Sequence, residues 1–179
     1  VRSLADKPTA EAVPLTDFPH PTPQLRDVQK ELLRYQRADG VTCTATLYLP
    51  AGYTAEQGPL PMLMWAYPED YKSADAASQL TDSPHRFIRV GPYTPLHWLT
   101  QGYAVLSGPS MPIIGEGDED PNDTYAEQLV SSAEAAVQEV IQRGVAQAGH
   151  IAIGGHSYGA FTVANLLAHC DLFCAGIAA

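Results

Sequence analysis

The chain has 179 residues, 45% of them hydrophobic, and is therefore long and apolar enough to bury one substantial core. Twenty acidic residues against ten lysines and arginines give a formal net charge of -10. That charge repels phosphate backbones and anionic lipid surfaces, which argues against nucleic-acid binding. The longest apolar runs, such as residues 60–66, fall far short of the roughly 20 residues that a membrane-spanning helix needs. We therefore expect no membrane insertion.

Neither the cysteines nor the acidic stretches follow a metal-binding pattern. Cys43, Cys170 and Cys174 are odd in number and fit no zinc or disulfide spacing, so we expect buried or half-buried free thiols. The acidic residues 116–123 lack the ligand spacing of a calcium-binding EF-hand loop and predict a solvated loop. The sequence predicts no metal site and no cofactor.

Residues 1–24 contain five prolines, a density that forbids a regular helix and removes the donors that a central strand needs. We interpret 1–24 as a linker or the trailing edge of another module. We interpret residues 25–179 as the N-terminal part of a further domain, whose sheet is incomplete at the C-terminal side. Within it, a strand-like segment at 32–35, a turn at Asp39-Gly40 and a period of two over 41–49 predict an antiparallel hairpin.

Buried strands follow the hairpin. Residues 60–66 are apolar on both faces, and similar runs occur at 103–106 and 150–153, with another beginning at Phe173. Helical segments separate these runs, a pattern typical of a mostly parallel sheet with helices on both faces. We therefore predict an α/β fold.

The clearest predicted helix spans residues 124–143, where apolar side chains recur with the 3.6-residue period. Thr124 and Glu127 have the spacing of a capping box, and Gly144 is placed to end the helix. The stretch 94–100 is also amphipathic. A further helix is expected after Ser157, with a buried face made of Phe161, Ala164, Leu167 and Ala168.

The pentapeptide Gly155-His156-Ser157-Tyr158-Gly159 has the G-x-S-x-G pattern of a nucleophile elbow. It lies between a predicted strand and a predicted helix, the context that an elbow requires. Such a turn presents the serine hydroxyl, and its small flanking residues allow close backbone approach. We expect Ser157 to be the nucleophile and the Tyr158 backbone N–H to stabilise an oxyanion. The alternative is an ordinary glycine-rich turn with a solvated serine.

A second oxyanion donor usually comes from the loop after an earlier core strand. Here that loop is predicted over residues 65–71, and the leading donor is the Tyr67 backbone N–H, with Trp65 a lesser alternative. The competing interpretation is that these aromatic side chains only pack beneath the site.

No residue of the chain is a convincing catalytic acid or base. His169 and Asp171 follow Ser157 too closely, because a continuous helix places His169 about 18 Å along its axis. We expect them in capping or surface roles. His156 adjoins the nucleophile, so its side chain points to the opposite face and suits packing better than proton transfer.

The elbow segment from Ile153 to Phe161 resembles the nucleophile segment of the prolyl oligopeptidase family of serine peptidases. The likeness is greatest to its glutamyl endopeptidase branch, known in plant chloroplasts and bacteria. Three further segments share this likeness, and the resemblance covers residues 15–179. The first, residues 35–50, contains Tyr-Gln-Arg-Ala-Asp-Gly-Val and Ala-Thr-Leu-Tyr-Leu-Pro. The others are residues 65–68, Trp-Ala-Tyr-Pro, and residues 112–119, Pro-Ile-Ile-Gly-Glu-Gly-Asp-Glu.

The resemblance implies an α/β-hydrolase domain preceded by a β-propeller, with the triad Asp and His in later loops that this chain lacks. It also implies that Ser157 is the nucleophile, that Tyr158 is an oxyanion donor and that the substrate is a peptide. A preference for cleavage after glutamate needs a cationic pocket, for which Arg86 and Arg89 are candidates. The alternative is that both are surface arginines that balance nearby acids.

Two further expectations depend on the same resemblance. The compartment that it implies is the chloroplast stroma, with the bacterial cytoplasm or periplasm as alternatives. The leading function is a serine-type peptidase that acylates Ser157. The alternatives are a catalytically silent subunit, whose open sheet edge another protein chain or the C-terminal hydrolase half covers, and an esterase with the same elbow.

Overall fold

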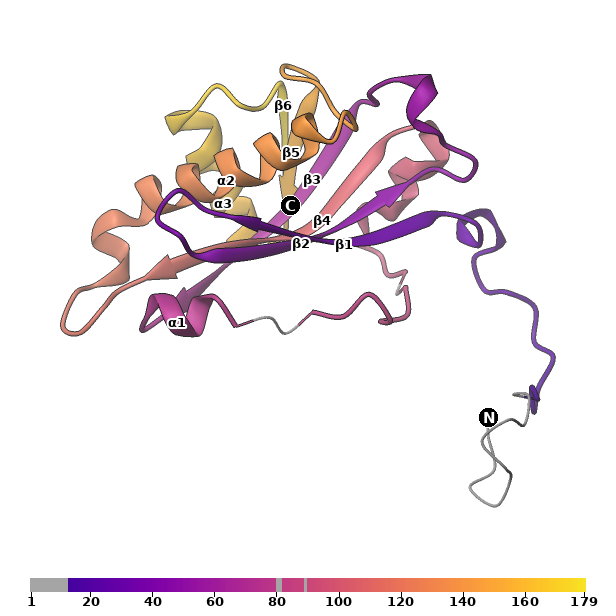
Figure 1. Ribbon diagram of the computed structural model, residues 1–179, viewed down its shortest axis with the longest axis horizontal. Helices are drawn as coiled ribbons and strands as arrows, with labels where there is room; N and C mark the ends of the chain where they lie inside the picture. Colours follow the sequence, from indigo (N-terminus) through magenta and orange to yellow (C-terminus); the bar gives the residue numbers. More distant parts are fainter. Residues whose placement is uncertain (1–12, 80–81, 89) are drawn as a thin grey trace.

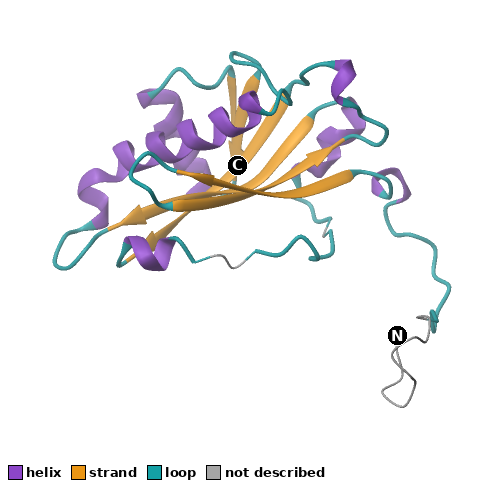
Figure 2. Cartoon of the chain, viewed as in Figure 1, coloured by secondary structure: helices purple, strands orange, loops and turns teal. Residues whose placement is uncertain are grey.

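The computed structural model describes residues 13–79, 82–88 and 90–179. Six strands form one mixed sheet in the order β1-β2-β4-β3-β5-β6 (Figure 1). Helices pack against this sheet, and loops join the elements around it (Figure 2). The expected α/β fold is confirmed. Short helical turns complete the chain: η1 (Pro23–Leu25), η2 (Ala55–Gln57), η4 (Pro121–Thr124) and the four-residue α1 (Ala74–Ala77).

The proline-rich start of the chain is described only from residue 13, so much of the predicted linker lies outside the described residues. Residues 13–22 form neither helix nor strand and extend away from the sheet (Figure 1). From residue 13 onward, Leu25 is the first buried side chain.

The predicted hairpin is confirmed, with longer strands than the pattern indicated. β1 (Gln29–Gln36) pairs antiparallel with β2 (Thr42–Leu49) along its whole length. In the turn, the Arg37 amide donates to the Val41 carbonyl at 2.9 Å, and Gly40 has φ of 88°. A positive φ is free of steric cost only at glycine, so Gly40 sets the turn.

The other four strands run parallel to one another. They are β3 (Met62–Tyr71), β4 (Ala104–Ile114), β5 (Ile151–Gly155) and β6 (Ala175–Ala178), and β2 joins β4 antiparallel. Because they are parallel, their carboxyl ends meet at one edge of the sheet. In open α/β sheets, ligands bind at that edge.

The loop predicted over residues 65–71 is wrong, because these residues continue β3. After a register shift between Trp65 and Tyr67, β3 pairs with residues 110–114 of β4, which is likewise longer than predicted. β5 pairs with β3 only as far as Trp65, so the continuation of β3 has one partner strand. Pro68, which has no N–H, is tolerated in such a strand.

Two helices cover one face of the sheet, α2 (Tyr125–Gln142) and α3 (Tyr158–His169) (Figure 1). Leu129, Ala133 and Val140 of α2 join the main core with Met62 and Met64 of β3. The opposite face is covered by η3 (Pro95–Gln101), where Leu96 and Leu99 pack with Tyr48 and Val105 in a second cluster. The prediction that the central strands are buried on both faces is therefore confirmed.

The ends of α2 were predicted only in part. Gly144 ends it as expected, with φ of 72° and its amide donating to the Ile141 carbonyl at 2.9 Å. The capping box at Thr124 and Glu127 is wrong, because the Thr124 side chain makes no capping hydrogen bond. Thr124 Oγ1 instead accepts from Gln128 Nε2 at 2.9 Å.

The predicted buried face of α3 is also wrong. Phe161, Ala164, Leu167 and Ala168 are all exposed, whereas the buried side is made of Gly159, Thr162, Val163 and Leu166. A polar residue lies on the buried side because Thr162 Oγ1 donates to the Tyr158 carbonyl at 3.1 Å. Apolar side chains also occur on the exposed side of this helix, so apolarity did not mark the face that meets the sheet.

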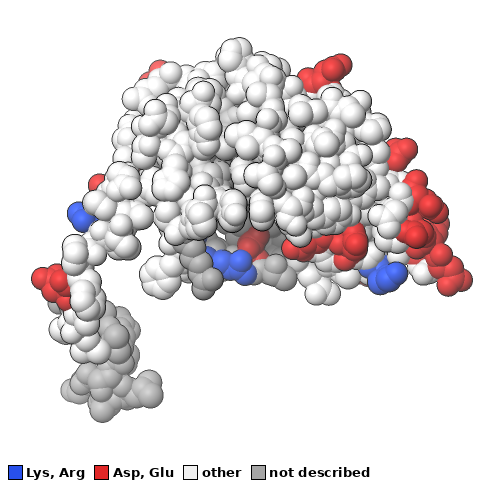
Figure 3. Space-filling view, turned by 180° about the vertical axis from the view of Figure 1, so that it is seen from behind, with Lys and Arg blue, Asp and Glu red and all other residues white. Residues whose placement is uncertain are grey.

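Surface features follow the composition. Acidic side chains gather along the edge formed by the exposed loop 116–123, while a broad area of the same face carries no charge (Figure 3).

The three free cysteines differ in burial: Cys43 is buried and Cys170 half-buried, but Cys174 is exposed, contrary to prediction. Cys174 is exposed because it precedes β6, whose residues are exposed in this chain.

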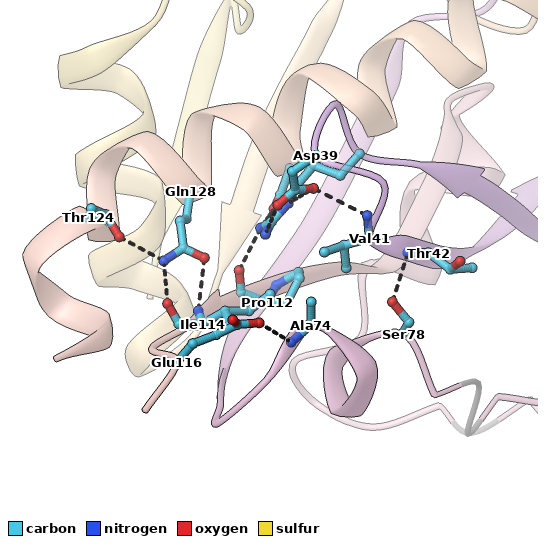
Figure 4. A network of polar contacts seen from close by, with 12 residues as sticks. Asp39, Val41, Thr42, Ala74, Ser78, Pro112, Ile114, Glu116, Thr124 and Gln128 are labelled. Atoms are coloured by element: carbon cyan, nitrogen blue, oxygen red, sulfur yellow. Dashed lines mark hydrogen bonds and ion pairs between the residues drawn. The ribbon is translucent and has the colours of Figure 1, made fainter. Parts of the chain in front are cut away.

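A polar network joins the hairpin turn to the end of β4 and to α2 (Figure 4). Arg37 is buried and bonds to both carboxylate oxygens of Asp39, while its Nη1 donates to the Pro112 carbonyl at 2.8 Å and to Ser132 Oγ at 3.2 Å. Hydrogen bonding to the Arg37 guanidinium lowers the pKa of Asp39. We call these four residues the Arg37 clamp.

Gln128 fixes the next residues of β4. Its Oε1 accepts from the Ile114 amide at 2.8 Å and its Nε2 donates to the Ile114 carbonyl at 2.9 Å (Figure 4). The end of β4 is therefore held from both the hairpin and α2. Since this end pairs with the continuation of β3, it also supports Tyr67.

Candidate active site

Ser157 lies in the turn between β5 and α3, at the carboxyl edge of the sheet. Its φ of 58° and ψ of -118° make it the only non-glycine residue with positive φ in the described part of the chain. A side chain in this region is sterically strained, and such strain persists only where the surroundings fix it. The residue is exposed. The G-x-S-x-G pattern predicted a strained turn of this kind between a strand and a helix.

Both flanking glycines are required by close backbone contacts. A Cβ at Gly155 would collide with the Gly159 carbonyl, and a Cβ at Gly159 would lie 2.5 Å from the Ala66 carbonyl oxygen. Real Cβ contacts do not come this close. The turn can therefore form only with glycine at these two positions.

The backbone amides around Ser157 differ in whether they already donate a hydrogen bond within the protein. The Ser157 amide donates to the Ala179 carbonyl at 2.9 Å, and the Gly159 amide donates to the His156 carbonyl at 2.9 Å. Tyr158 is the first residue of α3, and the amides of a first turn have no acceptor within their helix. Its N–H therefore lies at the positive end of the helix dipole, where a developing anion is stabilised.

Tyr67 lies beside the elbow, but its backbone N–H points away from it. A Cβ at Gly159 would be 2.5 Å from the Ala66 oxygen and 3.7 Å from the Ala66 carbon, so this carbonyl is aimed at Gly159. In a trans peptide the N–H of the next residue points the opposite way, and no described peptide is cis. Trp65 lies deeper in the sheet, between β4 and β5.

The Tyr67 ring does face the elbow. It packs edge-on against the Tyr158 ring, with centroids 6.0 Å apart, and is half exposed. Tyr158 also packs against Tyr125 and Phe161. Burial, followed by the neighbouring Tyr125 hydroxyl, raises the pKa of Tyr158, so its phenol stays protonated at neutral pH.

Arg86 lines a cavity of about 280 Å³ that also reaches Tyr67. Its guanidinium is 3.1 Å from the Asp82 carboxylate, and its side chain is 63% exposed. Glu69 lines the same cavity and accepts a hydrogen bond from the Tyr71 hydroxyl at 2.6 Å. The cavity thus contains two carboxylates and one guanidinium. Arg89, the other predicted cationic residue, lies outside the described residues.

A second cavity, of about 740 Å³, adjoins the first at Asp82, Arg86 and Gly108. Lys30 and His85 line it as well. The Lys30 ammonium donates to the Arg86 carbonyl at 2.6 Å. This second cavity therefore contains the Lys30 ammonium and the Arg86 guanidinium beside the Asp82 carboxylate, and Glu69 does not line it.

His169 and His156, the histidines considered as bases for Ser157, each bond to a backbone carbonyl. His169 Nδ1 bonds to the Asn165 carbonyl at 2.8 Å at the far end of α3, and Asp171 is exposed beyond it. His156 bonds through Nδ1 to the Ala179 carbonyl at 3.1 Å. Its ring stacks on Tyr93, a residue for which the sequence offered no pattern.

Two properties of the described residues bear on other kinds of function. They contain no helix whose length and apolarity would suffice to cross a lipid bilayer. They also contain no group of three or more histidine, cysteine, aspartate or glutamate side chains arranged to hold a metal ion.

Comparison with known proteins relates residues 39–174 to a family described as X-Pro dipeptidyl-peptidase (S15 family). Two curated relatives are each named "Probable glutamyl endopeptidase, chloroplastic". The Oryza sativa protein is 61% identical over 96% of this chain, and the Arabidopsis thaliana protein is 59% identical over 98%. The chain spans only 18% of the length of either relative.

Solved structures share the fold. Porphyromonas gingivalis dipeptidyl peptidase 4 matches with a TM-score of 0.60 and 22% identity, over 86% of this chain and 21% of that protein. An acetyl xylan esterase from Paenibacillus sp. R4 matches with a TM-score of 0.59 and 19% identity, over 92% of this chain and 51% of that protein. The chain therefore belongs to the X-Pro dipeptidyl-peptidase (S15) family, and its fold is the α/β-hydrolase fold of these solved structures.

Proposed function

We propose that Ser157 is the nucleophile of a serine peptidase and is acylated by the peptide that it cleaves. The observation that carries the proposal is the strained Ser157 backbone, held in a strand-to-helix turn beside the Tyr158 amide. The peptidase family and the names of both relatives support it. They also favour a peptidase over a silent structural subunit.

In this reaction Ser157 Oγ forms a bond to the scissile carbonyl carbon while a base takes the hydroxyl proton. The carbonyl oxygen becomes an oxyanion, which the Tyr158 N–H stabilises. Breakdown of the intermediate releases the amine, which takes up the proton, and water then hydrolyses the acyl-enzyme. The base and its orienting acid come from residues outside this stretch, in the same protein or in a chain bound to it.

Tyr67 is the proposed second oxyanion donor. Its side chain lies beside Tyr158, whereas its amide points away from Gly159. This orientation favours the phenolic hydroxyl over the backbone N–H as the donating group.

The proposed substrate is a peptide cleaved after glutamate, and the proposed compartment is the chloroplast stroma, both supported by the names of the relatives. Arg86 is the described candidate to bind the glutamate carboxylate, with Arg89 as a second. Asp82 lines both cavities, but Glu69 lines only the one that reaches Tyr67, so Arg86 would meet an acidic side chain on the side lined by Lys30 and His85.

Fluorophosphonate labelling of the intact protein, followed by mass spectrometry of the tryptic peptides, tests the nucleophile. We expect one adduct on Ser157, and none on that peptide in Ser157→Ala. The Ser131→Ala variant is a matched control, because Ser131 lies on α2, away from the turn. Absence of an adduct from a folded wild-type protein would refute the proposal.

Peptide and ester substrates test the specificity. We expect peptides with Glu before the scissile bond to be cleaved faster than matched Gln peptides. Arg86→Gln should reduce that ratio, whereas Arg34→Gln, at an exposed position on β1, should not. Rapid cleavage of chromogenic esters with none of peptides would point to an esterase instead.

A further inference from the structure

The residue that precedes the nucleophile is stacked on a ring from a distant segment. The Tyr93 and His156 rings are nearly parallel, with centroids 4.3 Å apart and an interplanar angle of 14°. Tyr93 lies just before η3, on the segment that crosses the sheet face opposite α2 and α3. The stack therefore joins that segment to the elbow, although 63 positions separate the two residues in the chain.

His156 is also held by a hydrogen bond to the acceptor that holds Ser157. Its Nδ1 lies 3.1 Å from the Ala179 carbonyl, which accepts the Ser157 amide at 2.9 Å. A carbonyl only accepts, so we assign the proton to Nδ1. The Ala179 amide in turn donates to the Gly155 carbonyl at 3.0 Å, so these bonds extend the β5–β6 ladder into the elbow.

We propose that Tyr93 and His156 are positioning residues, which hold the Ser157 backbone in its strained conformation. The inference rests on the proposed role of Ser157 as nucleophile. A residue with positive φ relaxes unless its neighbours are fixed, and His156 is the neighbour on the strand side. The stack fixes the His156 ring, and the Nδ1–H bond ties that ring to the carbonyl that holds Ser157.

This role differs from that of a catalytic base. The Nδ1–H donates its hydrogen bond to the Ala179 carbonyl, and the ring lies against Tyr93. Loss of the stack should therefore slow acylation of Ser157 while leaving the affinity for a peptide nearly unchanged. A defect confined to folding would instead lower the fraction of active protein and leave the rate of each active molecule unaltered.

Tyr93→Ala and Tyr93→Phe in the intact protein form the matched test. The readouts are the second-order rate constant of fluorophosphonate labelling at Ser157, and kcat and KM for a peptide substrate, both per labelled active site. We expect Tyr93→Ala to lower the labelling rate constant and kcat about 2- to 10-fold with KM little changed, because an aromatic pair contributes on that scale. Tyr93→Phe keeps the ring and should behave as wild type.

Two substitutions at His156 separate the stack from the hydrogen bond. His156→Asn places an amide nitrogen near the position of Nδ1 and removes the ring, whereas His156→Phe keeps a ring and removes the donor. We expect each to slow labelling less than the double loss in His156→Ala. Equal rates for wild type and Tyr93→Ala, or an equally slow Tyr93→Phe, would overturn the inference. Absence of labelling in the wild type would instead refute the proposed nucleophile.

Discussion

Ser157 takes a backbone conformation that its neighbours have to permit. Positive φ at a serine costs energy, about 1–3 kcal/mol for a strained residue of this kind. In this conformation the turn exposes Ser157 at the carboxyl edge of the sheet. Glycine on either side allows the backbone of the turn to lie against itself and against Ala66.

Gly155→Ala should therefore disrupt the turn. The added Cβ would collide with the Gly159 carbonyl, which is backbone and cannot move aside cheaply. We expect a loss of about 1–3 kcal/mol in the free energy of unfolding, measured by chemical denaturation, together with loss of Ser157 labelling. Gly91→Ala is the control, since a Cβ there meets nothing within 4 Å and should change stability by no more than about 0.5 kcal/mol.

The Tyr67 side chain can be tested by removing one atom. Tyr67→Phe deletes the hydroxyl and keeps both the ring that packs on Tyr158 and the backbone N–H. If the hydroxyl donates to the oxyanion, kcat should fall about 100-fold or more, the usual cost of losing such a donor. An unchanged kcat would show that the Tyr67 hydroxyl is not the oxyanion donor and would favour the Tyr67 backbone N–H instead. Tyr71→Phe, which affects a hydroxyl bonded to Glu69, serves as the comparison.

At the scale of elements, α3 shows the limit of apolarity as a guide. Its exposed side carries Phe161 and Leu167, and its buried side includes Thr162. A helix that follows an elbow has its orientation set by the turn, because Gly159 must lie against β3. The buried side is fixed by that contact, and the distribution of apolar residues does not decide it.

Leu166→Ala and Leu167→Ala test the orientation of α3. Leu166 is fully buried in the main core, so truncation should cost about 2–5 kcal/mol in the free energy of unfolding. Leu167 is 45% exposed and should cost about 1 kcal/mol or less. Chemical denaturation of the two variants provides the comparison. A larger loss at Leu167 would contradict the orientation seen here.

At the scale of the whole molecule, the Arg37 clamp joins three parts of the fold. It connects the hairpin turn to β4 and α2, and β4 in turn pairs with the continuation of β3 that carries Tyr67. A buried arginine is costly unless its donors are satisfied, and here Asp39, Pro112 and Ser132 satisfy them. The hairpin turn is thus connected through these contacts to the carboxyl edge of the sheet.

The clamp predicts a pH dependence of stability. The Arg37 hydrogen bonds hold the pKa of Asp39 below its usual 3.8, so the folded state favours the charged carboxylate. This stabilisation is present above the pKa of the unfolded chain and is lost as the pH falls through the lower pKa of the folded state. The stability advantage of wild type over Asp39→Asn should be constant near neutral pH and shrink below about pH 4.

Denaturant unfolding of wild type and Asp39→Asn across that range measures the difference. Asp118→Asn is the control, because Asp118 lies in the exposed loop after β4. An advantage over Asp39→Asn that does not change with pH would show that the carboxylate charge is unimportant to the clamp.

The sequence by itself determined the α/β class, the hairpin, the span of α2 and the elbow at Ser157. These follow from local causes: hydrophobic period, glycine conformation and the order of strand, turn and helix. The tertiary structure decided the length of β3 and β4, since only their mutual pairing satisfies the backbone of residues 67–71 and 110–114. It also decided which side of α3 is buried, where the Tyr67 amide points and that Tyr93 meets His156, because each depends on contacts between segments far apart in the chain.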